Sequence, residues 1–330
     1  MNTFGRIFRV SILGESHGEC VGVIVDGCPA GLGLSSADFL HDLGRRKGTG
    51  TGTTTRKEDD VPKIKSGVFN GRTTGAPILI LFENKDVDSS VYAKLKETPR
   101  PGHADFVVLK KFGRFNDYRG GGHLSGRLTV GLVAAGVIAK KLIRPITVKA
   151  KVTEVGGMAD IEAAVQKAIE ENDSVGGIVE CRVTGLPVGL GEPFFDSMES
   201  LLSHAAFSIP AVKGVEFGSG FACSRMRGSE YNDEIINAEG KTRTNNAGGI
   251  NGGITNGNEL VFRIAVRPTA SIKKRQKTID LKTGNPVEIL VEGRHDACIA
   301  LRVPVILEAI TAVVLADLML IEQKIPKIMG

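Results

Sequence analysis

The sequence is poor in aromatic side chains and has no strong excess of one charge. It contains no tryptophan, and Phe, Trp and Tyr together make up 5% of its 330 residues. Proteins that hold single-stranded nucleic acid stack the bases on aromatic rings, so this composition argues against that class. The net charge is +5, and the basic residues lie in scattered pairs and triplets. Without a longer basic stripe we expect no nucleic-acid partner, and a small polyanion is the better candidate.

Cysteine pairs and long uncharged apolar runs are also missing. The five cysteines include no C-x-x-C pair, which is typical of reduced, mostly buried thiols in a cytoplasmic protein. The N-terminal stretch has no long apolar region followed by a cleavage site. The most apolar run, 303–320, contains Glu308 and Asp317, so it falls short of about 20 uncharged residues. We therefore expect a cytoplasmic protein without a membrane partner.

Motifs that mark common enzyme classes are absent as well. There is no G-x-S-x-G turn and no G-x-x-x-x-G-K-[ST] loop, which argues against a common hydrolase fold and a P-loop NTPase. The six histidines show neither H-x-x-x-H nor H-E-x-x-H spacing, so we expect no metal site. Two of them fall on predicted helices and are interpreted as core or surface residues: His41 and His204. The other four lie in glycine-flanked loops: His17, His103, His123 and His295.

Glycine is what the sequence has in abundance. It accounts for 42 of 330 residues, against a usual share of about 7%. The stretch 98–129 combines two histidines, four arginines and the triplet Gly120–Gly122. Ser125 can cap a helix over 130–143, and helix N-termini favour anions. This pattern favours an anion-binding site, and the alternative is a Gly-rich surface loop with solvated charges.

Hydrophobic periodicity predicts strands and helices along the whole chain. Strand patterns occupy 8–13, 21–25, 78–82, 146–152, 178–183 and 260–266. Helix patterns begin at Ser36 and Asp196, and others cover 130–143, 160–171 and 303–320. A long Gly- and Asn-rich stretch, 218–257, is expected to be either functional or mobile.

One segment of the first half recurs in the second. Gly27–Gly33 reads GCPAGLG and Gly185–Gly191 reads GLPVGLG, an offset of 185 − 27 = 158 residues. Each copy follows a predicted strand and precedes a predicted helix. The hypothesis is an internal structural duplication, with two intertwined repeats over roughly 5–150 and 151–322. The alternative is a chance similarity between two Gly-Pro turns.

Several segments taken together resemble the chorismate synthase family. The main ones are GESHG with VGVIVDGCP at 14–29, RPGHAD with GGHLSGRLT at 100–129, and EGRHDACIALRVPVILEAI at 292–310. Further matches are DYRGGG, LPVGLGEP, AVKGVEFGSGF, NNAGGINGGI and RPTASI. The likeness runs in order from about Phe4 to Leu320, so it is far more specific than any single motif.

The resemblance implies a fold and a reaction. It implies one α+β domain over residues 1–330, in which β-sheets sandwich helices, assembling as a homotetramer. The family removes phosphate from 5-enolpyruvylshikimate 3-phosphate by a 1,4-anti elimination and so makes chorismate, the last step of the shikimate pathway that feeds aromatic amino acid biosynthesis. The reaction needs reduced FMN but has no net redox change. NADPH is a candidate reductant, and the resemblance leaves open whether this chain or a separate reductase reduces the flavin.

The resemblance also implies roles for particular residues. His17 and His103 are similar to the two family histidines that protonate the flavin and the leaving phosphate, and Asp296 is similar to the aspartate that assists proton removal. Arginines suit the two carboxylates and the phosphate of the substrate. Those expected to bind substrate or NADP are Arg46, Arg100 and Arg127. The positions expected to bind FMN are His123, Leu124, Ser125, Pro210, Ala211, Gly252, Arg267, Pro268, Thr269, Ala270, Ser271 and Arg294.

The sequence departs from the family pattern in one loop that concerns the substrate. Many relatives carry a further arginine where this chain has Gly52, and Arg56 or Lys57 is the candidate to replace it. Two rival functions stay open. One is a non-catalytic flavin- or phosphate-binding protein, which would need the arginines but not His17, His103 and Asp296. The other is a flavin oxidoreductase, which would consume NADPH in proportion to product.

Overall fold

The first sheet is built from the N-terminal third of the chain. The computed structural model describes residues 2–48, 50–53, 58–86, 92, 96–291 and 295–329. The sheet is antiparallel, with the order β1-β2-β3-β7-β4. Its strands are β1 (Thr3–Phe4), β2 (Arg9–Gly14), β3 (Cys20–Asp26), β7 (Ile78–Glu83) and β4 (Lys63–Ile64). Burial alternates along β7, where Ile78, Ile80 and Phe82 are fully buried, because successive side chains of a strand point to opposite faces.

The second sheet comes from the second half of the chain. It is also antiparallel and has the order β10-β13-β9-β8. Its strands are β8 (Thr147–Val155), β9 (Gly177–Thr184), β10 (Val212–Phe217) and β13 (Leu260–Val266). Read from the other edge, β8-β9-β13-β10 repeats the order β2-β3-β7-β4 of the first sheet. Helix α1 (Leu40–Lys47) follows β3, and helix α6 (Met198–Ala206) follows β9, so the helices occur at matching points.

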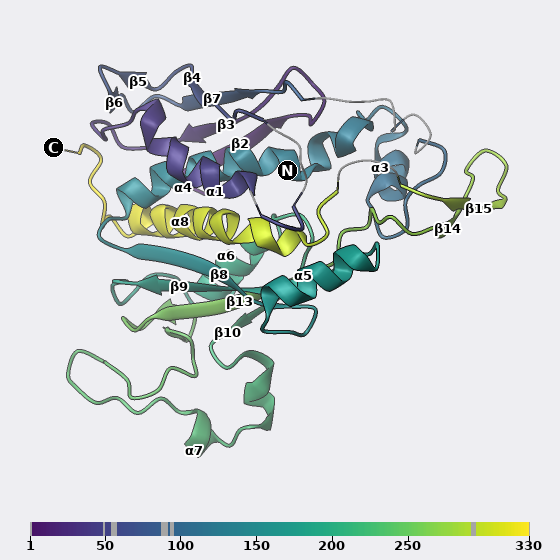
Figure 1. Ribbon diagram of the computed structural model, residues 1–330. Coiled ribbons are helices and arrows are strands. Elements are labelled where there is room, and N and C mark those ends of the chain that lie inside the picture. Colours follow the sequence, from purple (N-terminus) through teal and green to yellow (C-terminus); the bar gives the residue numbers. More distant parts are fainter. Residues whose placement is uncertain are drawn as a thin grey trace.

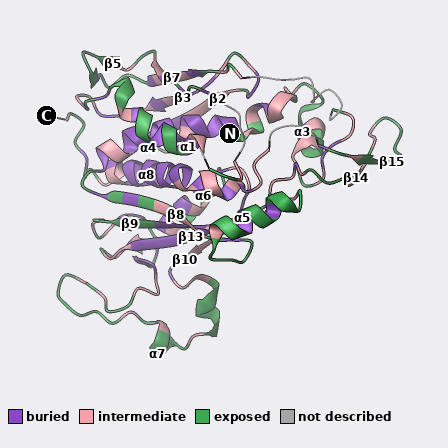
Figure 2. Cartoon of the chain, viewed as in Figure 1, coloured by how far each residue is buried: buried purple, intermediate pink, exposed green. Residues whose placement is uncertain are grey.

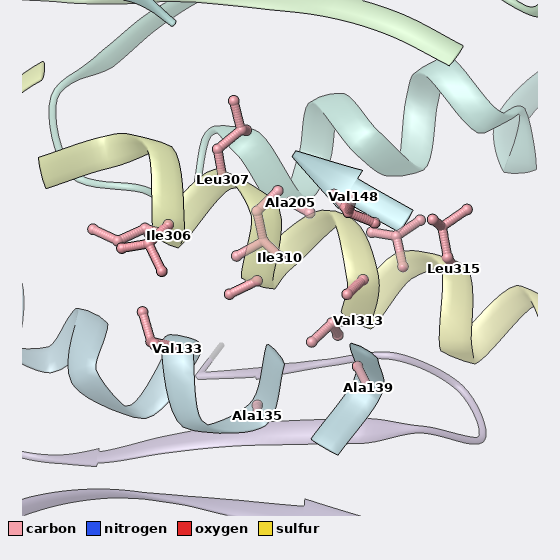
Figure 3. Packing of buried hydrophobic residues seen from close by; sticks show 14 of the residues in the cluster. Val133, Ala135, Ala139, Val148, Ala205, Ile306, Leu307, Ile310, Val313 and Leu315 are labelled. Atoms are coloured by element: carbon pink, nitrogen blue, oxygen red, sulfur yellow. The ribbon is translucent and has the colours of Figure 1, made fainter. Parts of the chain in front are cut away.

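A layer of helices lies between the two sheets (Figure 1). Helix α4 (Thr129–Leu142) packs on β2, β3 and β7, and helix α8 (Val303–Ile321) packs on β8 and β9. Figure 2 shows these two helices as the most buried part of the molecule. In Figure 3, Val133 of α4 faces Ile306 of α8, so the two helices join the halves of the core. The predicted α+β sandwich of sheets around helices is therefore confirmed.

Helix α8 is the most apolar segment of the described chain. Together with the short helix η6 (Ile299–Arg302) it forms a span, Ile299–Ile321, that is long and apolar enough to cross a membrane. Of its most apolar window, 78% is buried inside the protein. It is covered by α4, α6 and the second sheet, which is the environment of a core helix.

The remaining elements are short and decorate the sandwich. Helices α5 (Ile161–Glu170), α3 (Asp105–Phe112) and α7 (Gly228–Tyr231) lie outside the two sheets in Figure 1. Hairpins pair β5 (Val68–Phe69) with β6 (Arg72–Thr73), β11 (Ile250–Asn251) with β12 (Ile254–Thr255), and β14 (Gln276–Ile279) with β15 (Pro286–Ile289). The other 3-10 helices are η1 (Ser36–Phe39), η2 (Arg119–Leu124), η3 (Gly126–Leu128), η4 (Phe194–Asp196) and η5 (Gly220–Arg225).

Two details of the predicted elements were wrong. The stretch 98–129, expected to be broken throughout, contains helix α3, because Asp105–Phe112 is free of Gly and Pro and ends at Gly113 in the left-handed conformation. The helix expected to open at Asp196 begins at Met198 instead. Its N-cap is Ser197, whose hydroxyl accepts a hydrogen bond from the Ser200 amide. Asp196 is used elsewhere, in an ion pair with Arg6.

The first of the two similar turns is held by one threonine. Thr73 Oγ1 donates to the carbonyl oxygen of Pro29 at 2.6 Å and accepts from the Leu32 amide at 2.9 Å. Its backbone accepts from Gly31 N at 2.8 Å and donates to Leu32 O at 2.9 Å. Gly31 has a φ of +93°, a conformation that favours glycine.

The second turn is held in the same way by Thr255. Its Oγ1 donates to Pro187 O at 2.8 Å and accepts from Leu190 N at 2.9 Å, and its backbone accepts from Gly189 N at 3.0 Å. Pro187 and Leu190 each lie 158 residues after their counterparts (187 − 29 and 190 − 32). The shared bonds support the predicted duplication within one domain, which a superposition of residues 20–47 on 178–205 tests.

Candidate active site

The loops that carry most of the expected site residues meet at one end of the sandwich. Strand register fixes this end: Gly14 ends β2, and Cys20 pairs with Glu83 at the end of β7. Helix α4 starts there, since Thr129 Oγ1 lies 3.5 Å from Arg46 at the end of α1. In Figure 1 this is the end near α3. Ser125, as expected, is an N-cap, and its hydroxyl accepts from Arg127 N at 3.3 Å ahead of α4.

The glycine triplet places the loop directly against His17. Gly120, Gly121 and Gly122 all have positive φ, between 54° and 82°. A Cβ atom on Gly120 would overlap the His17 ring, so only glycine allows this approach. Ser16 N donates to Gly122 O at 3.1 Å, and the Tyr92 ring lies edge-on to His17 at 5.3 Å. His17 is therefore buried, with 8% of its surface exposed.

His103 lies in a second cluster, which is organised by Asp105. His103 Nδ1 is 2.6 Å from Asp105 Oδ1. Arg100 donates to the same carboxylate through Nε and Nη2, both at 2.8 Å, and through Nη1 to Ser271 Oγ at 3.0 Å. Burial favours the neutral acid, but the hydrogen bonds from Arg100 and His103 outweigh it and hold the pKa of Asp105 well below its ordinary value. The carboxylate is thus a permanent negative charge.

His295 lies within electrostatic range of this second cluster. Burial, together with the positive charges of Arg100, His103 and Lys273, lowers the pKa of His295 to about 4. It is therefore neutral at physiological pH. Its neighbour Asp296 accepts a hydrogen bond from Arg302 Nε at 3.2 Å.

Arg46 and Arg127 form a third cluster around Asp60. Arg46 Nη2 donates to Asp60 Oδ2 at 2.6 Å, and Arg127 Nη1 donates to Asp60 Oδ1. The carboxylate of Asp60 is completely buried, and the two arginine side chains are at most 8% exposed. Burial alone would raise the pKa of Asp60, but the two guanidinium groups lower it below its ordinary value. Two positive charges share one negative charge, so this site carries a net positive charge.

Asn84 connects this third cluster to the loop that carries His17. Its Oδ1 accepts from Arg127 Nε at 3.0 Å, while its Nδ2 donates to Glu15 O at 3.0 Å and Gly18 O at 2.9 Å. The charges of Arg127 and Arg302 also act on Arg46, whose pKa is lowered mainly by its burial. His17, the paired arginines and the Asp296–Arg302 pair therefore belong to one region.

A pocket connects the His103 cluster to the glycine triplet. His103, Arg100 and Asp105 line one part of it, and Gly121 and Leu124 line another. Tyr92, which packs against His17, also lines it. Expected substrate-binding and flavin-binding residues thus share a cavity.

The other positions expected to bind FMN are distributed unequally. His123 Nδ1 is 2.7 Å from Gly14 O, and Arg267 N donates to Ala211 O at 2.9 Å, so both segments lie at the site end. The segment 267–271 directly follows β13, and Pro210 precedes Ala211. Arg294, Arg56 and Lys57 lie outside the described residues.

Gly252 is not brought to this end of the chain. It lies between β11 and β12, where Gly253 O accepts from Met198 N at the start of α6 at 2.8 Å. The register of β9 and β13 places Leu260 and Val183 at that end, and Val266 and Gly177 at the site end. Within one chain, Gly252 is separated from the other expected residues by the length of β13.

Several residues of the site were missed in the sequence. Asp60 and Asn84 follow unremarkable polar stretches, and nothing in their spacing marks them. Asp105 could have been found, because it closes the segment RPGHAD, two residues after His103. Among the described residues, no group of three or more His, Cys, Asp or Glu side chains could hold a metal ion.

Two buried polar atoms suit a bound ligand. Thr269 Oγ1 and Arg46 Nε are buried and have no hydrogen-bond partner among the described residues. Both belong to segments expected to bind FMN or substrate. A buried donor without a partner costs about 1–3 kcal/mol, which a ligand oxygen would recover. The donors and the glycine backbone at this end therefore fit a flavin with its phosphate and an anionic substrate.

Comparison with known proteins identifies the family. The family model described as chorismate synthase matches residues 8–320. This chain belongs to the chorismate synthase family. A chorismate synthase of Chitinophaga pinensis is 64% identical over 325 residues, covering 98% of each chain. One of Methanocaldococcus jannaschii is 45% identical and covers 97% of this chain and 96% of its own length.

A solved structure of a chorismate synthase has the same fold. Its title is "Crystal Structure of Chorismate Synthase", and its TM-score to this chain is 0.74 at 26% sequence identity. The match covers 97% of this chain and 93% of the other. The protein is accordingly an enzyme of a lyase family in aromatic biosynthesis that acts on a small molecule and uses a reduced flavin.

Proposed function

We propose that this chain converts 5-enolpyruvylshikimate 3-phosphate to chorismate by 1,4-anti elimination of phosphate, with reduced FMN as its cofactor. The observation that carries the proposal is the meeting of three buried arginines with His17 and His103 at one end of the sandwich. Family membership favours this reading over a non-catalytic binding protein or an ordinary flavin oxidoreductase.

The arginines bind the substrate by charge. Arg46 and Arg127 bring two guanidinium groups against one carboxylate, and Arg46 Nε still lacks an acceptor among the described residues. Arg100 is aligned by Asp105 and lines the pocket. The substrate has two carboxylates and one phosphate, so three guanidinium groups match its charge. Burial excludes water and strengthens each of these interactions.

The histidines and one carboxylate handle the protons. His103 faces the pocket and is the donor of a proton to an oxygen of the leaving phosphate. His17 is the second proton carrier, which the family resemblance assigns to the flavin. Asp296, held by Arg302, assists in removing the proton that the substrate carbon loses. The C–O bond to phosphate and one C–H bond break, a C=C bond forms, and the products are chorismate and phosphate.

The cofactor is assigned to the loops around the glycine triplet and the end of β13. Residues 123–125, Pro210, Ala211 and 267–271 would hold FMN, with Thr269 Oγ1 as a donor that lacks a partner among the described residues. When bound, reduced FMN supplies an electron to the substrate transiently and takes it back, so there is no net redox change. NADPH or a separate reductase keeps the flavin reduced.

We further propose that the enzyme is a cytoplasmic homotetramer. Gly252 supports assembly, because it lies at the opposite end from the other expected FMN residues. A neighbouring subunit would bring its own Gly252 to the flavin. Sedimentation velocity of the purified protein tests the assembly.

The function is tested by anaerobic assay of phosphate release. The purified protein is mixed with 5-enolpyruvylshikimate 3-phosphate and dithionite-reduced FMN, and phosphate and chorismate are measured. We expect equal amounts of both, with many turnovers per flavin. NADPH added afterwards should not be consumed in proportion to product. Absence of phosphate release, or stoichiometric NADPH consumption, would overturn the proposal.

A further inference from the structure

The contact between Asp105 and His103 fixes where His103 carries its protons. Nδ1 of His103 is 2.6 Å from Asp105 Oδ1 and 3.1 Å from Arg100 Nη2. A guanidinium group can only donate, and an ionised carboxylate can only accept. Arg100 Nη2 already donates to Asp105 Oδ1 at 2.8 Å. The shorter contact is satisfied only if Nδ1 carries a hydrogen and donates it to Asp105.

We propose that Asp105 is a positioning residue, which holds a proton on Nδ1 of His103 and thereby reserves Nε2 for proton exchange with the ligand. The proposal rests on the proposed function and deepens it. When the step occurs, the Nε2–H bond breaks and the proton passes to a phosphate oxygen. His103 is then neutral and keeps its Nδ1 hydrogen on Asp105.

The surroundings of Asp105 keep it ionised and immobile. It accepts from Arg100 N at 3.1 Å and from Arg100 Nε and Nη2, in addition to His103. It is the first residue of α3, so the positive end of that helix also favours its charge. Asp105 has 18% of its side chain exposed, and His103 has 25%. A carboxylate with this many donors cannot turn to another partner without leaving a buried charge unpaired.

The same carboxylate aligns a substrate-binding group. Arg100 binds it through two nitrogens in the planar forked geometry that carboxylates accept, which leaves Nη1 for Ser271. Asp105 thus couples the expected acid, the expected substrate arginine and the expected flavin segment. His295, also within range of His103, is held neutral by burial and by the nearby positive charges. Asp105 is accordingly the negative partner that distinguishes Nδ1 from Nε2.

The competing explanation is that Asp105 serves only to neutralise the buried Arg100. A purely structural counter-ion would affect stability and the KM for substrate, but it would not select a tautomer of His103. The two explanations therefore differ in a measurement that does not involve turnover.

The test compares Asp105→Asn, Asp105→Glu and wild type, with Asp173→Asn as the matched control. Asp173 pairs with Lys274 at 2.7 Å on the surface, away from the site. Histidine is labelled with ¹⁵N, and the imidazole shifts are read by magic-angle-spinning NMR on sedimented protein. With six histidines in the chain, subtracting the spectrum of His103→Gln assigns the signals of His103. Kinetics of phosphate release follow on the same proteins.

We expect wild type and Asp173→Asn to show the neutral Nδ1–H form of His103 above pH 8. Asp105→Asn should lose that preference, its kcat should fall by about 10²-fold, and the alkaline fall in its kcat should move to lower pH by about one unit. Asp105→Glu should recover part of both the tautomer and kcat. An unchanged tautomer in Asp105→Asn, or a loss confined to KM, would overturn the proposal. If wild type releases no phosphate, the proposed function fails, while the tautomer measurement still decides the role of Asp105.

Discussion

Two buried carboxylates determine how the arginines of this site are arranged. Asp60 receives Arg46 and Arg127, and Asp105 receives Arg100 and His103. A cluster of guanidinium groups would repel itself without such partners, and a fully neutralised cluster would bind anions poorly. One carboxylate for two arginines keeps the side chains in place and still leaves a positive charge for the substrate.

Replacing Asp60 tests this arrangement through stability. Asp60→Asn removes the only negative charge bonded to Arg46 and Arg127 among the described residues, so we expect the free energy of unfolding to fall by about 3–5 kcal/mol. Urea unfolding measures it. The neighbouring Asp59→Asn is the control, because Asp59 is 69% exposed and pairs with Lys85 on the surface. Its loss should stay below about 1 kcal/mol. Equal losses in the two variants would contradict the buried role of Asp60.

His295 predicts a pH dependence of stability. Its pKa in the folded protein is about 4, below the ordinary value of 6.5, so the unfolded chain takes up a proton first as pH falls. Stability should therefore decrease between pH 6.5 and 4, and this part of the decrease should be missing in His295→Gln. Urea unfolding across that range measures the difference. His41→Gln, changed at a side chain that is 83% exposed, should follow wild type. A wild-type curve parallel to that of His295→Gln would refute the assignment.

At the scale of elements, the close approach of α4 and α8 holds the two halves together. Gly136 of α4 lies against Ala309 of α8, and a Cβ on Gly136 would overlap both Cα and Cβ of Ala309. Both helices begin at the site end, where α4 follows the glycine triplet and α8 follows Arg302. Their packing therefore also sets the distance between the loops that carry Arg127 and Asp296.

Adding a methyl group at this contact should be costly. Gly136→Ala is expected to lower the free energy of unfolding by roughly 1–3 kcal/mol, because the helices must separate. Gly44→Ala on α1 is the control. Gly44 has open space around it, so alanine there should stabilise the helix by about 0.5–1 kcal/mol. Thermal and urea unfolding of both variants compare the signs. A stabilising Gly136→Ala would show that the helices do not touch there.

Elements with strong periodicity could be predicted from the sequence, and the site contacts between distant segments could not. The helix expected at 130–143 is observed as Thr129–Leu142, and that at 160–171 as Ile161–Glu170, because their apolar spacing is regular. Helix α3 was missed, since prolines and glycines flank it on both sides. Asp60 meets Arg127 across 67 positions of the chain, and no local pattern encodes such a pair.

At the scale of the whole molecule, the direction of the strands brings the site together. Loops after β2, β7, α1 and β13 and before α4 and α8 all fall at one end, although they span residues 14 to 302. The resemblance selected His17, His103, the arginines and segment 267–271, and the structure brings them to this end. Gly252 is the exception, and the proposed neighbouring subunit accounts for it.

The repeated strand order explains why the core could be anticipated from a short echo in the sequence. Each half contributes four strands in the same order and two helices, and Thr73 and Thr255 hold equivalent turns at the end opposite the site. The functional loops differ between the halves, since the histidines and arginines of the site come from unequal insertions. Duplicated cores with divergent loops place function outside the repeat.

The most direct measurement is single-turnover phosphate release by wild type and His103→Ala with saturating reduced FMN and substrate under anaerobic conditions. The account predicts that His103→Ala binds FMN nearly as tightly as wild type but releases phosphate about 10²-fold more slowly. A rate within a few-fold of wild type would contradict the claim that His103 is the acid of this site.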